Sequence, residues 1–292
     1  MKHLKKFETT SQYEAYTADT ANFIKPNVSL CKDGSGVHYS PRVATETRVV
    51  ATFNVTSTSE PTTIIGNFDT DVYSGFSAIE IDGVVQPSVV SAYTFDTTGE
   101  HTVKYTLVDQ TNLGDIAFED CGDLTSVVIP DNVITIGGEA FRACTNLENC
   151  TIGSGVTSIG GYAFYGCNSL TSINIPNSVT SIGTMAFFSC SFTSCTIGAG
   201  IISIGESAFD SCESLTNVTI GSGVTSIDDY AFLYCKALSS VTINATTPST
   251  LGDGVFSSNA SGRKIYVPSA SVDVYKAASG WSTYASDIEA IQ

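Results

Sequence analysis

Few residues in this sequence have the types and spacing that catalysis requires. The histidines are His3, His38 and His101, and none has a serine, cysteine or aspartate at the spacing of a known catalytic motif. Because catalytic groups must converge within hydrogen-bond reach, we interpret these histidines as surface or turn residues. The sequence also lacks a Gly-x-Ser-x-Gly nucleophile elbow. These observations argue against an enzyme.

The cysteines follow a repeat and not a metal-binding pattern. Six of the nine stand in Ala-Phe-x-x-Cys motifs, at steps of 23, 23, 23, 22 and 23 residues: Cys121, Cys144, Cys167, Cys190, Cys212 and Cys235. Cys150 and Cys195 fall within the strands of the same repeat, and Cys31 stands alone. Structural zinc sites draw on two closely spaced cysteine pairs, which this pattern does not supply. We therefore expect buried free thiols that act as small hydrophobic side chains.

The motifs recur every 22 or 23 residues, and a fixed period of this length is typical of a solenoid. We therefore expect the elements that carry the motifs to be the coils of a solenoid. Each coil begins with the pattern Leu-x-x-Val-x-Ile, a strand that points Leu124, Val127 and Ile129 inward in the first copy. A second short strand follows, such as residues 156–159. The Ala-Phe-x-x-Cys motif then forms a single helical or 3₁₀ turn that presents Ala, Phe and Cys to the core.

Two further patterns are better explained by the repeat than by chemistry. The acidic pairs Glu119-Asp120 and Asp228-Asp229 have the residue types of general acids, bases or calcium ligands. They stand at different coil positions, so we interpret them as solvated surface charge. The Gly-Ser-Gly segments 153–155 and 221–223 look like phosphate loops, but they recur at the bend of the repeat. We therefore predict no metal and no cofactor.

The composition is that of a folded, acidic protein. Of the 292 residues, 42% are hydrophobic and 14% are charged, which is typical of a chain with a substantial core. The formal net charge is −16, and residues 105–262 contain fourteen acidic side chains against two basic ones, Arg142 and Lys236. This balance argues against binding nucleic acid or an anionic membrane surface. No stretch resembles a membrane span or the apolar core of a signal peptide.

The repeat resembles the BspA-like leucine-rich repeats of the Treponema pallidum type. The segments LTSVVIPDNVITIGGEAFRAC and LTSINIPNSVTSIGTMAFFSC carry this likeness, and residues 251–256 (LGDGVF) are a degenerate copy. The resemblance implies a right-handed leucine-rich-repeat solenoid over residues 110–262, with about six coils plus the degenerate seventh. Residues 263–292 are similar to the closing segment of that family and predict a C-terminal cap. Its apolar side would come from Val272, Tyr275, Trp281, Tyr284 and Ile288.

The part before the repeats has two sections, and the whole fold is predicted to be mainly β. In residues 42–109 the hydrophobic period is two, over runs 48–56, 62–66, 76–81, 89–95 and 101–107. These runs predict a short, antiparallel, immunoglobulin-like β-sandwich, whose last strand, 103–108, could also cover the start of the solenoid. In the lead segment, residues 1–41, we expect a short helix over 12–18 and two strands within 23–40. MKHLKKFETTSQYEAY resembles the opening of proteins of gut bacteria and their prophages, some of them tail-associated.

Two surfaces of the solenoid are candidates for binding. The first, here called the aromatic strip, flanks the Ala-Phe motifs and consists of Tyr162, Tyr165, Phe188, Tyr230 and Tyr234. Aromatic residues are enriched in contact surfaces, although packing between neighbouring turns would explain them equally well. The second, the polar strip, is the outward face of the long strands. The alternative interpretation is that this face is the ordinary solvated surface of a β-ladder. Its members are Ser126, Asn149, Thr151, Ser172, Asn174, Ser194, Thr196, Asn217, Thr219, Ser240 and Thr242.

These patterns predict a non-enzymatic recognition or adhesion module that binds a protein or a host surface component through the solenoid. The alternative is a structural component of a phage tail or another surface assembly, in which the repeats are spacers. The sequence leaves the location open among display on a cell surface, transport on a phage particle and the cytoplasm. Nothing in the sequence points to a particular oligomeric state.

Overall fold

The structure is a computed structural model, and it describes residues 28–33, 36–41, 46–66 and 75–292. The chain has two compact units, Met1–Glu46 and Thr47–Gln292. In the first unit, β1 (Val28–Asp33) and β2 (Gly36–Pro41) pair as an antiparallel hairpin. The two strands expected around the glycine-rich turn are therefore confirmed. The helix expected over 12–18 lies outside the described residues.

The second unit begins with an antiparallel sheet that is continuous with the solenoid. Its strands are β3 (Arg48–Val55), β5 (Phe76–Ile81), β6 (Val84–Val85) and β8 (Gly99–Leu107), in the order β3-β8-β5-β6. The free edge of β3 pairs with β10 (Leu124–Val128), the first long strand of the repeats. The antiparallel strands and the coils also share one hydrophobic core.

This arrangement does not confirm the immunoglobulin-like sandwich. The predicted runs do form strands, since β4 (Thr62–Thr63) and β7 (Ala92–Tyr93) pair with each other as well. The larger sheet, however, continues into the coils, and the strand that covers the first long coil strand is β3 and not the run 103–108. The hydrophobic alternation of a strand shows which of its faces is buried. It does not show which other strand will pair with the edge of that strand. For this reason the sequence predicted the wrong strand as the cover of the first coil.

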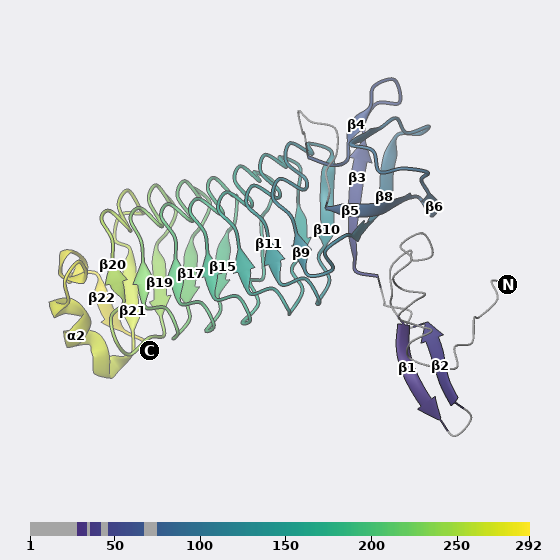
Figure 1. Cartoon of the computed structure of the whole chain (residues 1–292). Coiled ribbons are helices and arrows are strands. Elements are labelled where there is room, and N and C mark those ends of the chain that lie inside the picture. Colours follow the sequence, from purple (N-terminus) through teal and green to yellow (C-terminus); the bar gives the residue numbers. More distant parts are fainter. Residues whose placement is uncertain (1–27, 34–35, 42–45, 67–74) are drawn as a thin grey trace. The chain divides into compact units, whose positions relative to one another are not determined.

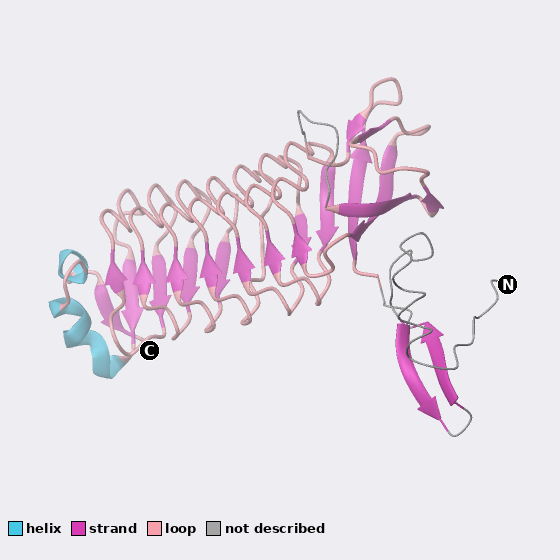
Figure 2. Cartoon of the chain, in the orientation of Figure 1, coloured by secondary structure: helices cyan, strands magenta, loops and turns pink. Residues whose placement is uncertain are grey.

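The solenoid consists of coils stacked side by side, most of them with one long and one short parallel strand (Figures 1 and 2). An isolated bridge between Asn174 and Thr196 links the third coil to the long-strand ladder. The register keeps equivalent residues aligned, so that Ile136, Ile159 and Ile182 follow one another. The long strands are β10, β12 (Asn149–Thr151), β15 (Ser194–Ile197), β17 (Asn217–Ile220) and β19 (Ser240–Ile243). The short strands are β9 (Asn112–Leu113), β11 (Thr135–Ile136), β13 (Ser158–Ile159), β14 (Ser181–Ile182), β16 (Ser203–Ile204), β18 (Ser226–Ile227) and β20 (Thr250–Leu251).

The glycine-rich bends between the long and short strands are structural. A Cβ atom on Gly155 would overlap the carbonyl oxygen of Asp131 in the preceding coil. The N–H of Ser154 donates to the carboxylate of the same aspartate at 2.7 Å. Only glycine allows this close backbone approach. The Gly-Ser-Gly segments are therefore explained by coil stacking, as the sequence indicated.

Each Ala-Phe-x-x-Cys motif forms two successive turns and not a helix. In the first coil, the N–H of Glu119 donates to the carbonyl of Ile116, and that of Cys121 to the carbonyl of Phe118. Ile116 and Asp120 have positive φ, and the equivalent residues of the later coils do too. The N–H groups of Ile116, Phe118 and Asp120 donate to carbonyls of the next coil. The motif thus works as a third inter-coil ladder, which a helical turn could not provide because its N–H groups bond within the turn.

The interior of this ladder is a column of stacked phenylalanines. Seven rings, from Phe118 to Phe256, lie 5.0 to 5.6 Å apart between neighbouring centroids. Five thiols donate to the phenylalanine carbonyl of the preceding coil at 3.0 to 3.2 Å, as Cys144 does to Phe118. Seven of the eight cysteines with described side chains are buried, and Cys150 is half-buried. The expectation of core thiols is therefore confirmed for those seven.

The end of the solenoid is covered as predicted. β21 (Lys264–Val267) and β22 (Ile288–Ala290) extend the long-strand sheet, and a 3₁₀ turn (Ser269–Ser271), α2 (Val272–Ala277) and a 3₁₀ helix (Trp281–Tyr284) lie between them. The Tyr275, Trp281 and Ile288 side chains are buried, and Val272 and Tyr284 pack against the core. None of the helices in the described part of the chain has the length and hydrophobicity of a membrane span.

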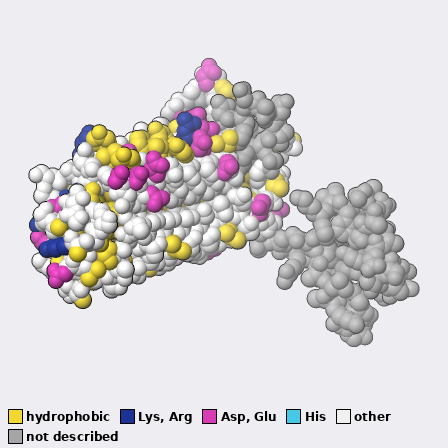
Figure 3. Space-filling model, turned by 60° about the vertical axis from the view of Figure 1, so that its left-hand side comes forward, with side chains coloured by type: hydrophobic (Ala, Val, Ile, Leu, Met, Phe, Trp, Pro, Cys, Tyr) yellow, Lys and Arg dark blue, Asp and Glu magenta, His cyan; other side chains and the backbone are white. Residues whose placement is uncertain are grey.

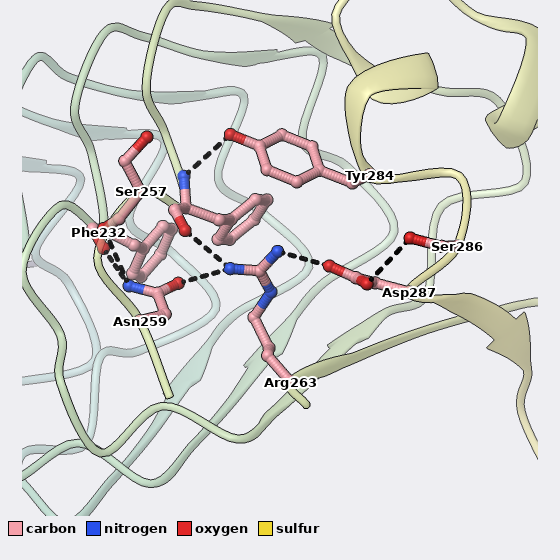
Figure 4. A network of polar contacts seen from close by, with 8 residues as sticks. Phe232, Ser257, Asn259, Arg263, Tyr284, Ser286 and Asp287 are labelled. Carbon is pink, nitrogen blue, oxygen red and sulfur yellow. Dashed lines mark hydrogen bonds and ion pairs between the residues drawn. The ribbon is translucent and has the colours of Figure 1, made fainter. Parts of the chain in front are cut away.

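A buried arginine joins this cap to the last coil (Figure 4). Arg263 donates to the carbonyl of Phe256 at 2.6 Å and forms an ion pair with Asp287 at 2.7 Å. Its guanidinium also lies over the rings of Phe256 and Tyr284. A buried cation is unfavourable without such partners. Because the partners of Arg263 come from both the last coil and the cap, this residue holds the cap in a defined position on the coil.

Candidate contact surface

The outward side chains of the Ala-Phe-x-x-Cys turns form a surface that we call the ridge. Three positions of each coil belong to it: the residue before Ala, the residue after Phe and the residue before Cys. Figure 3 shows hydrophobic side chains gathered along the ridge, with acidic side chains beside them. All five residues of the aromatic strip lie on these turns. Tyr162, Tyr230 and Tyr234 are 37%, 41% and 48% exposed, whereas Tyr165 and Phe188 are partly buried.

Part of the strip is internal packing, as the alternative interpretation held. The rings of Tyr165 and Phe188 are stacked, with centroids 4.7 Å apart, and Tyr162 lies 5.8 Å from Tyr165. A Cβ atom on Gly254 would come within 2.9 Å of the Tyr230 ring, so this ring lies against the next coil. The strip therefore combines packed ring faces with exposed ring area, which is the character of a preformed contact surface.

The backbone does not require tyrosine at the most exposed positions. Tyr162, Tyr230 and Tyr234 have φ of 58°, 62° and 54°, a left-handed conformation that is unfavourable for bulky side chains. One coil has Ser207 at the position of Tyr230 and Ser211 at the position of Tyr234, with φ of 52° and 60°. Small residues thus satisfy the fold at both places. The left-handed φ recurs at both positions in every coil and belongs to the repeat, so the backbone alone does not explain the exposed rings of the tyrosines.

An unpredicted acid interrupts the apolar part of the ridge. The residues after the ladder phenylalanines follow one another from coil to coil: Glu119, Arg142, Tyr165, Phe188, Asp210, Leu233 and Ser257. Within this column Arg142 forms an ion pair with Glu119, and Tyr165 stacks on Phe188. Asp210, only 8% exposed, accepts a hydrogen bond from the Ser211 hydroxyl at 2.9 Å. Burial raises the pKa of its carboxyl above the ordinary value. Aligning the coils would have revealed an acid between Phe188 and Leu233.

The acidic pairs singled out in the sequence have separate environments. Asp120, Asp228 and Asp229 are exposed, and Glu119 is partly buried against Arg142. Asp228 and Asp229 line a shallow hollow of about 390 Å³ together with Glu206. Asp229 accepts a hydrogen bond from the N–H of Asp253 at 2.8 Å. Within the described ranges no three His, Cys, Asp or Glu side chains are placed to hold a metal ion.

His101 differs from the sequence interpretation, because it is buried and paired. Its Nδ1 lies 2.7 Å from a carboxylate oxygen of Asp82, and its Nε2 lies 2.9 Å from the carbonyl of Thr97. Burial acts to lower the pKa of His101, but these two acceptors outweigh it and raise the pKa above its ordinary value. The partner is 19 residues away, at the end of the neighbouring strand β5, a spacing that no local motif would reveal. The contact is a structural ion pair, and the side chains of His3 and His38 lie outside the described part.

The polar strip runs along the long strands as expected. Equivalent residues lie side by side, with Ser194, Asn217 and Ser240 in one row and Thr196, Thr219 and Thr242 in another. The rows continue onto the antiparallel sheet, where Ser126 pairs with Thr52. Ion pairs flank the strip at both ends, Lys104 with Glu80 and Lys264 with Glu289. Asn149, Thr151, Ser172, Asn174, Ser194, Thr196 and Asn217 are exposed, and Ser126, Thr219, Ser240 and Thr242 are partly buried.

Stacked coils with long and short parallel strands and an internal phenylalanine column define a leucine-rich-repeat solenoid of the short bacterial type. The sequence matches the family described as "BspA type Leucine rich repeat region" over residues 111–192 and 180–279. The chain belongs to this family. No curated protein sequence matches it significantly.

Several solved structures are similar to the chain. A leucine-rich repeat protein of T. pallidum is 29% identical, with 56% of this chain and 74% of that protein covered and a TM-score of 0.49. A leucine-rich repeat protein from Bacteroides ovatus is 20% identical over 68% and 71% of the two chains, with a TM-score of 0.40. The pneumococcal vaccine antigen PcpA is 18% identical over 64% and 44%, with a TM-score of 0.47.

Proposed function

We propose that the chain is a non-enzymatic recognition module that binds a protein or a host surface component through the ridge of its solenoid. The observation that carries the proposal is the placement of Tyr162, Tyr230 and Tyr234. They are exposed, and they occupy left-handed backbone positions where the same fold uses serine. Tyrosine supplies a large contact area at a low entropic cost, which is why it is enriched where proteins bind.

Membership in the repeat family supports a binding role, because a stacked solenoid offers an extended surface. The polar strip is the second candidate face. Its side chains are small and uncharged, and they lack the aromatic anchors that carry most of the energy of a typical interface. Display on a bacterial surface or a phage particle is part of the proposal, and it rests on the resemblances of the repeats and of the lead segment.

The test compares the full chain with a Tyr230→Ser/Tyr234→Ser variant. Both are immobilised, incubated with solubilised surface proteins of cultured epithelial cells, and washed, and the retained proteins are identified by mass spectrometry. We expect proteins that the wild type retains and the variant loses, at an unchanged melting temperature. Identical retention by both would overturn the ridge as the contact surface.

An Asn174→Ala/Asn217→Ala variant is the matched control on the polar strip, where both side chains are exposed. If this variant loses the retained proteins and the tyrosine variant keeps them, the binding site is on the polar strip. If the wild type and the variants retain no protein, and the wild type assembles into particles on its own, the result supports the spacer role instead. Size-exclusion chromatography with light scattering measures that assembly.

A further inference from the structure

The ridge contains a carboxylate without a cation. Asp210 is 8% exposed, and among the described residues no lysine, arginine or histidine forms an ion pair with it. Its partners are the hydroxyl and the backbone N–H of Ser211, which are both neutral. A buried carboxylate is unfavourable unless it is paired, so a fold that needed only packing would place an apolar residue here.

The position of Asp210 aims it at the ridge surface. The flanking residues Phe209 and Cys212 are fully buried in the core, whereas Asp210 belongs to the outward column after the ladder phenylalanines. The N–H of Ser189 donates to its backbone carbonyl, and the N–H of Ser211 donates to that of Leu233, which fixes the register of the three coils. The carboxylate therefore lies between the coils of Phe188 and Leu233, inside the span of the aromatic strip.

The charges around Asp210 favour a cationic partner. The basic side chains within residues 105–262 are Arg142 and Lys236, and each forms an ion pair with a glutamate of the preceding coil. Glu206, on the coil of Asp210, and Asp228 and Asp229, on the next coil, add further negative charge around a hollow. Acidic and hydrophobic side chains accordingly meet along the ridge in Figure 3. A positive segment would be attracted to this surface and an acidic one repelled.

We infer that the ridge binds a segment of a partner protein in which an arginine or lysine stands next to apolar residues, and that this cation pairs with Asp210. The inference rests on the proposed function, since it names the chemistry of the segment that the ridge takes. The apolar residues pack on Tyr230, Tyr234 and Phe188. Arginine fits best, because its planar guanidinium binds a carboxylate and stacks on aromatic rings at the same time.

The first experiment selects ligands from a phage-displayed library of random 12-residue peptides on the immobilised full chain. We expect selected peptides enriched in arginine or lysine beside apolar residues, and loss of their binding to the Tyr230→Ser/Tyr234→Ser variant. Ridge-dependent peptides without basic residues would overturn the assignment of Asp210 and leave the proposed function standing. Peptides that bind both chains equally would overturn the proposed function itself.

The second experiment measures the pairing directly with the tightest selected peptide and a copy in which citrulline replaces its arginine. Asp210→Asn should weaken the arginine peptide by about tenfold or more and leave the citrulline peptide unchanged. Glu213→Gln is the matched control, because Glu213 is exposed and already paired with Lys236. The melting temperature of Asp210→Asn should equal or exceed that of the wild type. Equal weakening of both peptides by Asp210→Asn would show that Asp210 does not pair with the arginine.

Discussion

Asn259 donates a hydrogen bond of 2.8 Å from its side-chain amide to the carbonyl of Phe232. In the preceding coils a cysteine thiol occupies this place, as Cys235 does toward Phe209. The last carbonyl of the column, that of Phe256, accepts from Arg263 of the cap. Each carbonyl along the phenylalanine column therefore has a donor, although the donor changes from thiol to amide to guanidinium. The need to satisfy buried carbonyl groups thus explains why the repeat has a hydrogen-bond donor, cysteine or asparagine, at this position.

The first prediction follows from this contact. Asn259→Leu leaves the Phe232 carbonyl without its donor and also removes the oxygen that accepts from Arg263 at 3.1 Å. We expect a loss of about 1 to 3 kcal/mol in the free energy of unfolding, as for other unsatisfied buried groups. Urea denaturation followed by circular dichroism measures it. Asn259→Cys restores the donor that the other coils use and should recover part of the loss. Equal losses in the two variants would show that the hydrogen bond contributes nothing.

Cysteine reactivity tests the register of the whole column. Burial raises the pKa of the Cys167, Cys195 and Cys235 thiols to about 12, so almost none of each is thiolate at neutral pH. We expect iodoacetamide to modify Cys31 fastest, the half-buried Cys150 slowly, and the other seven only in denaturant. Mass spectrometry of peptides from a time course gives the rates. Rapid labelling of Cys144, Cys167 or Cys212 in the native protein would contradict the packing described above.

The repeat made most of the solenoid predictable, because a fixed period assigns the same role to residues 22 or 23 positions apart. Burial of Leu124, Val127 and Ile129 followed from strand alternation, and it is observed. The two-turn geometry of the Ala-Phe motif did not follow. It depends on positive φ at residues such as Tyr162 and Met185, whose types give no sign of it.

The candidate sites were less predictable, because they depend on contacts between coils and strands. The pairing of β3 with β10 joins residues about 70 positions apart, and no local pattern encodes it. Asp210 looks like one more acid in an acidic sequence. Its significance comes from its burial and from the pairing of Arg142 and Lys236 with glutamates, which only the stacked coils reveal.

Removing the cap should cause the chain to self-associate. Deleting residues 263–292 exposes Phe256 and leaves the edge of β19 free, because β21 is its partner. Open edges and apolar coil ends invite pairing with other chains, so we expect aggregation or large oligomers. Size-exclusion chromatography with light scattering measures them. Deleting only the exposed Ile291 and Gln292 is the control and should leave the wild-type elution unchanged. A truncated chain that elutes as a monomer and melts normally would show that the cap is dispensable.

Stability should depend on pH through His101 and Asp82. The pKa of His101 is raised, so its contribution is complete below its unfolded value of about 6.5 and is lost as the pH rises through the folded value. Burial acts to raise the pKa of Asp82, but the bonds from His101 and the Thr102 N–H outweigh it and lower the pKa. That contribution is present above the unfolded value of about 3.9 and is lost as the pH falls through the folded value.

The measurement compares melting temperatures of the wild type and His101→Gln from pH 4 to pH 9. The advantage of the wild type should be largest between about pH 4 and 6.5 and should shrink in alkaline solution. Glu148→Gln, an exposed acid of the solenoid, controls for the general effect of net charge. A difference that stays constant over the whole range would mean that His101 contributes packing alone.

The last prediction separates the ridge from the core beneath it. Phe164 and Phe209 are fully buried in the phenylalanine column, so truncating either to alanine should cost about 3 to 5 kcal/mol through the cavity that remains. Tyr162→Ser and Tyr234→Ser expose little of the core. They should change the free energy of unfolding by no more than about 0.5 kcal/mol, as ordinary surface substitutions do. Chemical denaturation of the four single variants gives both values. If the tyrosine variants lose as much stability as the phenylalanine variants, the exposed tyrosines are part of the packing. The search for the binding face would then turn to Asn174, Asn217 and the rest of the polar strip.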